Sequence, residues 1–416
     1  MPLVTKIGVY VIKPFGIGIF DAITISYAIF ISSFITVLIY AFFQLFKKTY
    51  SFWIANFTSI IFVFFHFWIF RKYKTGNSYM LWTRDACTYY YYVIPNLLNV
   101  ILVLWVAVKP EICDSLSNND LKRKAVFLFV LYYSIFSNIW GSIIFAAYLS
   151  GKILIEILRM LKNGESFIAS VKKHVSSLLI LVLWLLSQLI ELSGGRASVV
   201  QKTNYFTGIK STLGFCYDTV KNISSSFLLF AVILIIGGCA TAIAKNELAS
   251  LGKKCLQYVW ASVVIFMYLI LTCAKVEPEY ISRPDVYYGL FAFLCIIELI
   301  CLAEILKHCK NIMVYMPLII SIIFFHIDTQ GKTFVESTLL NEEPEIINDI
   351  NNNIVDQFLK AEASGEKTLK LYVPKYESED NWPYATYAGS RLSSFMYEYG
   401  ITDRYIEVSE IIPVSK

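Results

Sequence analysis

The chain has 416 residues, of which 57% are hydrophobic and only 16% carry a charged side chain. Soluble domains carry about a quarter charged residues, so this composition excludes an ordinary water-soluble globular fold. Long uncharged apolar runs recur through residue 327, each near the ~20 residues that a helix needs to cross a bilayer. The sequence therefore predicts an α-helical polytopic membrane protein.

Charge divides the chain into two parts. Residues 1–327 contain 28 lysines and arginines against 15 acidic residues, whereas residues 328–416 contain 8 against 16. Loops beside anionic headgroups tend to be basic, and the acidic tail is typical of a water-facing piece. We therefore predict a transmembrane helical domain over 1–327 and a small soluble domain over 328–416.

The cysteines do not form a recognisable pattern. Nine are scattered singly along the chain, with no CxxC pair and no Cys/His cluster. Neither a disulfide framework nor a metal site is predicted from such spacing. Phosphate-loop, dinucleotide-binding, zinc-protease and nucleophile-elbow motifs are also absent. We expect no cofactor and no nucleic-acid partner.

Hydropathy predicts nine membrane spans. Their apolar runs lie near residues 17–46, 51–70, 87–108, 125–150, 175–192, 225–244, 255–274, 286–306 and 312–327. The first run is overlong, which fits either a tilted span or an interfacial helix followed by a span. Two of the connections, 151–174 and 193–224, have the mixed apolar and polar character of helices resting on the membrane surface.

Lysine and arginine in the loops predict the orientation. Sixteen lie in the amino-terminal segment and the loops on its side of a nine-span protein, against twelve in the loops on the other side. The positive-inside rule then places the amino terminus in the cytoplasm. With nine spans, the carboxy-terminal domain is extracytoplasmic.

The tail has the pattern of a small α/β domain. Apolar residues at helical spacing run through PEIINDINNNIVDQFLKAEASG and end at Gly365. TLKLYVP alternates like a strand, GSRLSSFMYEYG returns to a helical pattern, and RYIEV is a second short strand. Helix–strand–helix–strand order favours one α/β unit.

CAKVEPEYISRPDVYY, residues 273–288, is a short polar connection between two strongly apolar segments. Its prolines fix the direction of the flanking charges, so a rigid loop of this kind could combine a general base with a phosphate clamp. Glu279 and Asp285 are the candidate catalytic bases, and Arg283 is a candidate phosphate ligand. The alternative is a solvated loop whose charges pair with one another.

Four further residues are candidates by position. Arg196, in SGGRAS after the fifth span, offers a planar fork suited to a phosphate, or else anchors at headgroups. Glu298 lies well inside the eighth span, where an ionisable group is costly and is a functional candidate by default. Asn138 in the fourth span and Glu191 at the end of the fifth could line the same polar cavity. Packing or interhelical hydrogen bonding is the alternative for each.

Three parts of the chain, a span, a turn and the tail, resemble a known family. YSIFSNIWGS, the turn LIELSGGRAS, and the tail segments ASGEKTLKLYVPKYE and NWPYATYAGSRLSSFMYEYGI are similar to bacterial multi-pass proteins of the GT-C superfamily. These are the polyprenyl-phosphosugar glycosyltransferases that include O-antigen glucosyltransferases. The resemblance implies a bacterial plasma-membrane protein that takes a sugar from an undecaprenyl-phosphate donor and passes it to a surface-glycan acceptor.

One element of that family pattern is missing. GT-C enzymes resemble one another in carrying an acidic catalytic residue in the first outer loop, yet residues 47–50 hold none. Asp21 or Asp85 could substitute, the first spans could be arranged differently, or the protein could lack this activity. The sequence therefore favours a transferase of cell-envelope glycan assembly, with a non-catalytic assembly component or a lipid-linked sugar transporter as alternatives.

Overall fold

The computed structural model describes residues 2–72, 76–78, 80–81, 88–114, 121–193, 205–308, 317, 319–323 and 344–415. Most of these residues are helical. By contacts the chain divides into two compact units. Unit 1 contains Met1–Ser32 and Thr338–Lys416, and unit 2 contains Ser33–Ser337. The predicted boundary between residues 327 and 328 lies outside the described residues, so that boundary stays a prediction.

Unit 2 is a bundle of apolar helices. Across the described residues, seven helices are long and apolar enough to cross a membrane. They are α2 (Ile19–Lys47), Tyr89–Val108 (η3 Tyr89–Val93 with α5 Ile94–Val108), α8 (Ile139–Lys162), α10 (Val175–Ser193), α13 (Ser225–Ala244), α14 (Leu248–Val276) and α15 (Pro284–Lys307). Two apolar helices are shorter, α3 (Phe52–Trp68) and α7 (Leu121–Ile135). The multi-pass helical character predicted from hydropathy is confirmed.

The predicted fourth span is not one helix. α7 ends at Ile135 and α8 begins at Ile139, because Asn138 adopts an extended backbone and its side chain accepts a hydrogen bond from Gly141 N. Such an N-cap satisfies a free amide at the start of a helix. α7 packs against α5 with Phe127 beside Trp105, and Asn99 donates to Ser134 O. The run 125–150 therefore forms parts of two helices, α7 and α8, which are separated by a short turn at residues 136–138.

Interhelical contacts define two ends of the bundle. Lys48 donates to Val108 O and Tyr50 donates to Glu304, so α2, α5 and α15 end together. We call this the Tyr50 end. The end where α5, α8, α13 and α15 begin is the Arg283 end.

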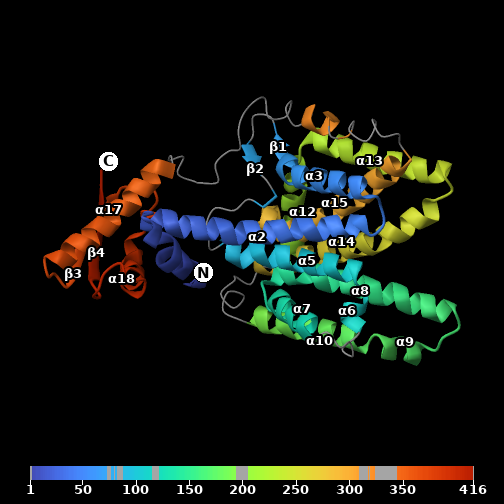
Figure 1. The fold of residues 1–416 in the computed structure, drawn as a ribbon, viewed down its shortest axis with the longest axis horizontal. Helices are drawn as coiled ribbons and strands as arrows, with labels where there is room; N and C mark the ends of the chain where they lie inside the picture. The colour runs from blue at the N-terminus through green and yellow to red at the C-terminus, as the bar shows by residue number, and fades with distance from the viewer. Residues whose placement is uncertain are drawn as a thin grey trace. The chain divides into compact units, whose positions relative to one another are not determined.

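The middle of the bundle is formed around α15, which packs against α13 and α14, while α14 packs against α8 (Figure 1). Gly238 makes the first of these contacts close, since a Cβ there would lie 2.8 Å from Cys301 Cα. α13 continues through Gly237 and Gly238 without a break.

Shorter elements connect the long helices. They are β1 (Phe70–Lys72) paired antiparallel with β2 (Gly76–Ser78), α6 (Glu111–Asp114), α9 (Phe167–Lys173), α12 (Tyr205–Lys221) and η4 (Pro278–Ser282). The predicted surface helix over 151–174 is divided: residues 151–162 continue α8, and α9 is separate. α12 packs against α14, where Gly208 approaches Ala274 O so closely that a Cβ would lie 2.4 Å away.

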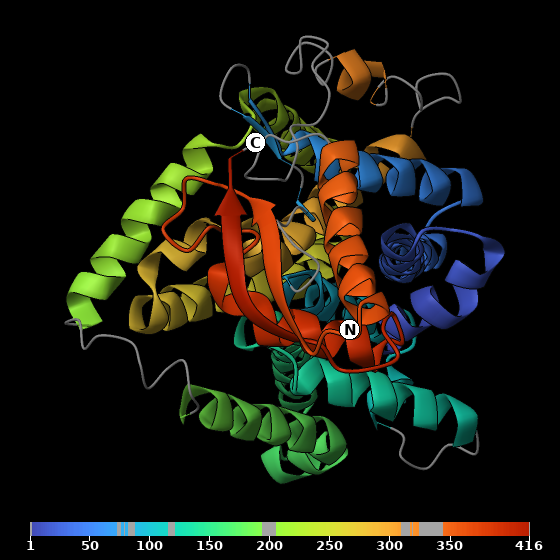
Figure 2. The ribbon, with the colours of Figure 1, turned by 90° about the vertical axis from the view of Figure 1, so that its left-hand side faces the viewer.

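Unit 1 contains a small α/β fold. Its carboxy-terminal elements are α17 (Pro344–Ala363), β3 (Thr368–Pro374), η6 (Thr386–Ala388), α18 (Gly389–Glu398) and β4 (Glu407–Val414). β3 and β4 pair in parallel, and α17 packs along β3 (Figure 2). The helix–strand–helix–strand order predicted for the tail is confirmed, with the second strand a few residues later than RYIEV.

The amino terminus completes unit 1. It comprises α1 (Pro2–Ile7), the π-helical turn η1 (Gly8–Ile12), η2 (Lys13–Phe15) and the first turns of α2. Gly8 lies directly on α2, where a Cβ would be 2.7 Å from Ile23 Cα. Val9 and Ile23 share one hydrophobic core with Phe358 and Leu371 of the tail. The two ends of the chain are therefore parts of the same unit.

Candidate functional site

Arg283 and Asp285 are joined directly at the Arg283 end of the bundle. Pro284 is the first residue of α15, and the guanidinium of Arg283, just before it, contacts the carboxylate of Asp285, just after it. Nε lies 3.0 Å from Oδ1 and Nη2 lies 2.5 Å from Oδ2, a two-pronged ion pair. Asp285 is buried, whereas 34% of the side-chain surface of Arg283 is exposed to solvent. The alternative in which the loop charges pair with one another matches this geometry.

Two tyrosines also hold the Arg283 side chain. Its Cζ lies 4.6 Å from the ring centre of Tyr92 and 5.5 Å from that of Tyr280, within range of cation–π attraction. Burial lowers the pKa of Arg283, but the hydrogen bonds to Asp285 and its negative charge outweigh that effect and raise it. The guanidinium is therefore a fixed cation at a partly open position.

Asparagines of neighbouring helices lie close to this loop, and one of them contacts it directly. Asn96 donates to the backbone oxygen of Asp285 at 2.6 Å, and Asn138 donates to Tyr91 O besides capping α8. The side-chain oxygens of Asn96 and Asn99 are buried and accept no hydrogen bond from the described residues. Asn138 therefore acts as a helix cap and contacts the backbone of Tyr91, the residue before Tyr92.

The other predicted residues lie apart from this pair. Glu279 belongs to η4 and is exposed, four residues from Arg283. Glu191 is exposed near the end of α10. Glu298 is buried inside α15, and its Oε2 accepts no hydrogen bond among the described residues. Arg196 lies outside the described residues. Their predicted roles stay predictions.

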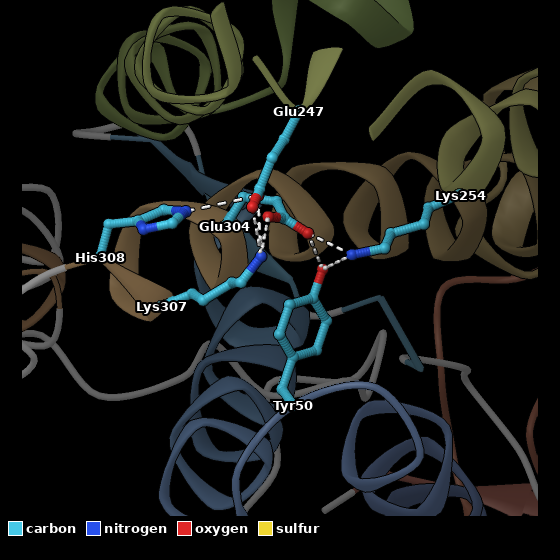
Figure 3. A network of polar contacts seen from close by, with 6 residues as sticks. All are labelled: Tyr50, Glu247, Lys254, Glu304, Lys307 and His308. Carbon is cyan, nitrogen blue, oxygen red and sulfur yellow. Dashed lines mark hydrogen bonds and ion pairs between the residues drawn. The ribbon is translucent and has the colours of Figure 1, made fainter. Parts of the chain in front are cut away.

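A second polar cluster lies at the Tyr50 end, where sequence analysis placed nothing. Glu304, almost fully buried on the last turns of α15, forms an ion pair with Lys254 of α14. Tyr50, in the turn between α2 and α3, donates to the same carboxylate oxygen at 2.7 Å, and Lys254 Nζ lies 3.2 Å from the phenol oxygen (Figure 3). Burial raises the pKa of Tyr50 well above its usual range, and Glu304 acts in the same direction. The phenol therefore stays protonated as a donor.

The cluster extends to the turn between α13 and α14. Lys307 Nζ lies 2.7 Å from Glu247 Oε2 and 3.8 Å from Glu304 Oε2. His308 Nε2 lies 3.3 Å from the same oxygen of Glu247. The hydrogen bonds from Lys307 and His308 lower the pKa of Glu247. Figure 3 shows both carboxylates turned toward the ammonium of Lys307.

Glu247, Glu304 and His308 have the spacing of a metal site, with one ligand atom from each within 4.8 Å of the others. The charges argue against that use. Lys254 and Lys307 already balance the two carboxylates, and the Lys307 ammonium contacts both of them. A metal ion would have to displace a lysine from each glutamate it bound. The arrangement fits an ion-pair network that ties three helix ends together.

The sequence did not predict this network because each of its residues, taken alone, is common at its position in the chain. A lysine or glutamate in the last turn of an apolar helix is typical of a membrane boundary. Glu304, Lys307 and His308 are polar residues at the end of α15 in the sequence. Their partners lie far away in the chain, in the turn after α2, the turn before α14 and α14 itself.

Comparisons with known proteins give no relative from which a role could be taken. Neither a protein-family model, nor a curated protein, nor a solved structure matches the chain.

Proposed function

We propose that the protein is a membrane-embedded glycosyltransferase that takes a sugar from a polyprenyl-phosphate donor at the Arg283 end of the bundle. The observation that carries this proposal is the fixed, half-exposed guanidinium of Arg283. Asp285 and two tyrosine rings hold it in place, so little freedom is lost when it meets a phosphate. Apolar helices around it suit a donor whose other end is a long hydrocarbon chain.

The chemistry assigns different roles to the two acidic residues. Both oxygens of Asp285 accept hydrogen bonds from Arg283, so in this proposal Asp285 is a positioning residue. Glu279, exposed on η4, is the base. It takes the proton of the acceptor hydroxyl as that oxygen bonds to the sugar's anomeric carbon. The bond from that carbon to the phosphate oxygen breaks, and Arg283 stabilises the phosphate that leaves.

The test compares surface-glycan composition in cells that carry Arg283→Lys, Asp285→Asn or Glu279→Gln. Lysine keeps the charge but loses the fork and the ring contacts, so Arg283→Lys is expected to reduce transfer about 10-fold or more. Lys275→Gln removes an exposed charge near the same loop and is expected to leave transfer unchanged. Normal glycan in all three variants, with normal protein levels, would contradict the proposal.

A transporter for lipid-linked sugars is the second candidate, and Glu298 favours it. A buried carboxylate inside an apolar helix, with one oxygen lacking a described partner, is a feature of proton-coupled pathways. Glu298→Gln separates the two functions. Loss of lipid-linked sugar movement in vesicles, with sugar transfer intact, would favour transport. A non-catalytic role in glycan assembly predicts that neither reaction depends on these side chains.

A further inference from the structure

Unit 1 has a hydrophobic core built from both ends of the chain. Val9, Ile19 and Ile23 come from the first 23 residues, and the remaining buried members come from the tail. These are Ile354, Val355, Phe358, Ala361, Leu371, Val373, Met396, Ile406 and Ile411. Burying apolar side chains together is what stabilises a small domain of this kind. Two segments on opposite sides of a membrane could not share such a core.

α2 leads from this core into the bundle. Its first turns belong to unit 1, with Phe20 and Tyr27 packed against the shared core. By contacts unit 1 extends to Ser32, but Tyr27 is the last residue of α2 that packs against the shared core. Residues 28–47 of α2 number about 20, which at about 1.5 Å per residue matches a hydrocarbon layer of roughly 30 Å. The overlong first apolar run thus divides into a water-facing start and one span.

We infer that the amino and carboxy termini lie on the same side of the membrane and fold there as one domain. A chain of this kind crosses the membrane an even number of times. The sequence alone predicted nine crossings, an odd number. Dividing the predicted fourth span into α7 and α8 adds one crossing, so the described residues hold nine apolar helices that could cross. The last span predicted from the sequence, 312–327, lies mostly outside the described residues and makes the tenth, and ten crossings return the tail to the side of the amino terminus.

The direction of α2 decides which side this is. α2 ends at the Tyr50 end of the bundle, so the chain enters the membrane from the side of the Arg283 end. If α7 and α8 are separate crossings, the loops at the Tyr50 end contain sixteen lysines and arginines. The amino-terminal segment and the loops at the Arg283 end together contain twelve. The positive-inside rule places the Tyr50 end in the cytoplasm. Both termini are then extracytoplasmic, in contrast to the cytoplasmic amino terminus expected from nine spans.

Epitope tags before Met1, after Lys416 and beside Gly164 test this directly. Gly164 lies in the exposed turn between α8 and α9, with a positive φ of 84° and open space around it. We expect antibodies to reach both terminal tags in spheroplasts and the Gly164 tag only in inverted vesicles. Terminal tags on opposite sides would overturn the inference, and both terminal tags in the cytoplasm would overturn its orientation.

A matched pair of substitutions tests the shared core without a tag near it. Val9 is buried in the core and Val11, two residues later, is exposed. Val9→Asp is expected to increase cleavage of the tail by an added protease several-fold, whereas Val11→Asp leaves the cleavage rate unchanged. Equal rates for both variants and the unaltered protein would contradict a core shared by the two ends. Neither readout depends on sugar transfer, so the proposed function and this inference can fail separately.

Discussion

Tyr50 donates a 2.7 Å hydrogen bond to Glu304, although 254 positions separate the two residues in the chain. The bond joins the turn after α2 to the end of α15, and Lys254 of α14 contacts both partners. A neutral phenol, a buried carboxylate and an ammonium thus fasten three parts of the bundle at one end. This network gives the clearest predictions about stability.

Glu304→Ala is expected to destabilise the protein strongly. Removing one partner of a buried ion pair leaves the other uncompensated, at a cost of about 3–5 kcal/mol. Thermal unfolding in detergent measures the effect. Glu191→Ala, at an exposed glutamate of α10, is the matched control and should leave the melting temperature nearly unchanged. Similar melting temperatures for the two variants would mean that the network contributes little.

Tyr50→Phe is expected to cost less, about 1 kcal/mol, because it removes one hydrogen bond but keeps the ring packing. Its effect depends on Glu304. In the Glu304→Ala background the phenol has lost that acceptor, so the cost of Tyr50→Phe should shrink. Additive losses in the double variant would show that the two side chains act independently.

The lowered pKa of Glu247 predicts that the stability of the folded protein depends on pH. Lys307 and His308 lower its pKa below the ordinary value of 4.5, so the folded state favours the ionised carboxylate. The stabilisation is then present above about pH 4.5 and is lost as the pH falls through the lowered pKa. Melting curves of the unaltered protein and Glu247→Gln should differ at pH 7, and the difference should shrink as the pH falls below 4.5. A difference that stays constant as the pH falls has another cause.

Replacing each of the two adjacent glycines of α13 by alanine should change the stability of the protein by different amounts. A Cβ at Gly238 would meet the backbone of Cys301, at 2.8 Å from Cα and 3.0 Å from the carbonyl oxygen. At Gly237 the nearest atom is the end of the Ile305 side chain, at 3.1 Å, which can move. We expect Gly238→Ala to destabilise the protein by about 1–3 kcal/mol and Gly237→Ala to change it by less than about 1 kcal/mol. Equal effects would place α13 farther from α15 than it lies here.

Most helices could be predicted from the sequence because hydropathy and periodicity are local properties. The tail elements were found in the same way, from spacing and from Gly365 as a stop signal, and Gly365 does adopt a positive φ of 78°. The turn at Asn138 was not predicted. Ser137 and Asn138 are two small polar residues within a long apolar run, and only the cap geometry makes them a boundary.

The sites were less predictable because their partners are distant in sequence. The prolines around Arg283 coincide with the starts of η4 and α15, but the contacts of Arg283 with the rings of Tyr92 and Tyr280 arise from tertiary packing that the sequence does not show. The Tyr50–Glu304 network had a local signal only in the polar residues that end α15, and nothing near them in the sequence indicated their partners. The joining of the two ends in unit 1 was likewise invisible, since the first 18 residues looked like the approach to a span.

The shared core of unit 1 can be completed only after residues as far apart as Val9 and Ile411 have both been synthesised. Val9 and Ile23 leave the ribosome well before Ile411, which lies about 400 positions after Val9 in the chain. At about 5–20 residues per second, roughly 20–80 seconds separate the two events. Throughout that interval the amino-terminal segment must wait with its apolar side chains uncovered. A nascent chain stalled before β4 would therefore be a better target for chaperones and proteases than the finished protein.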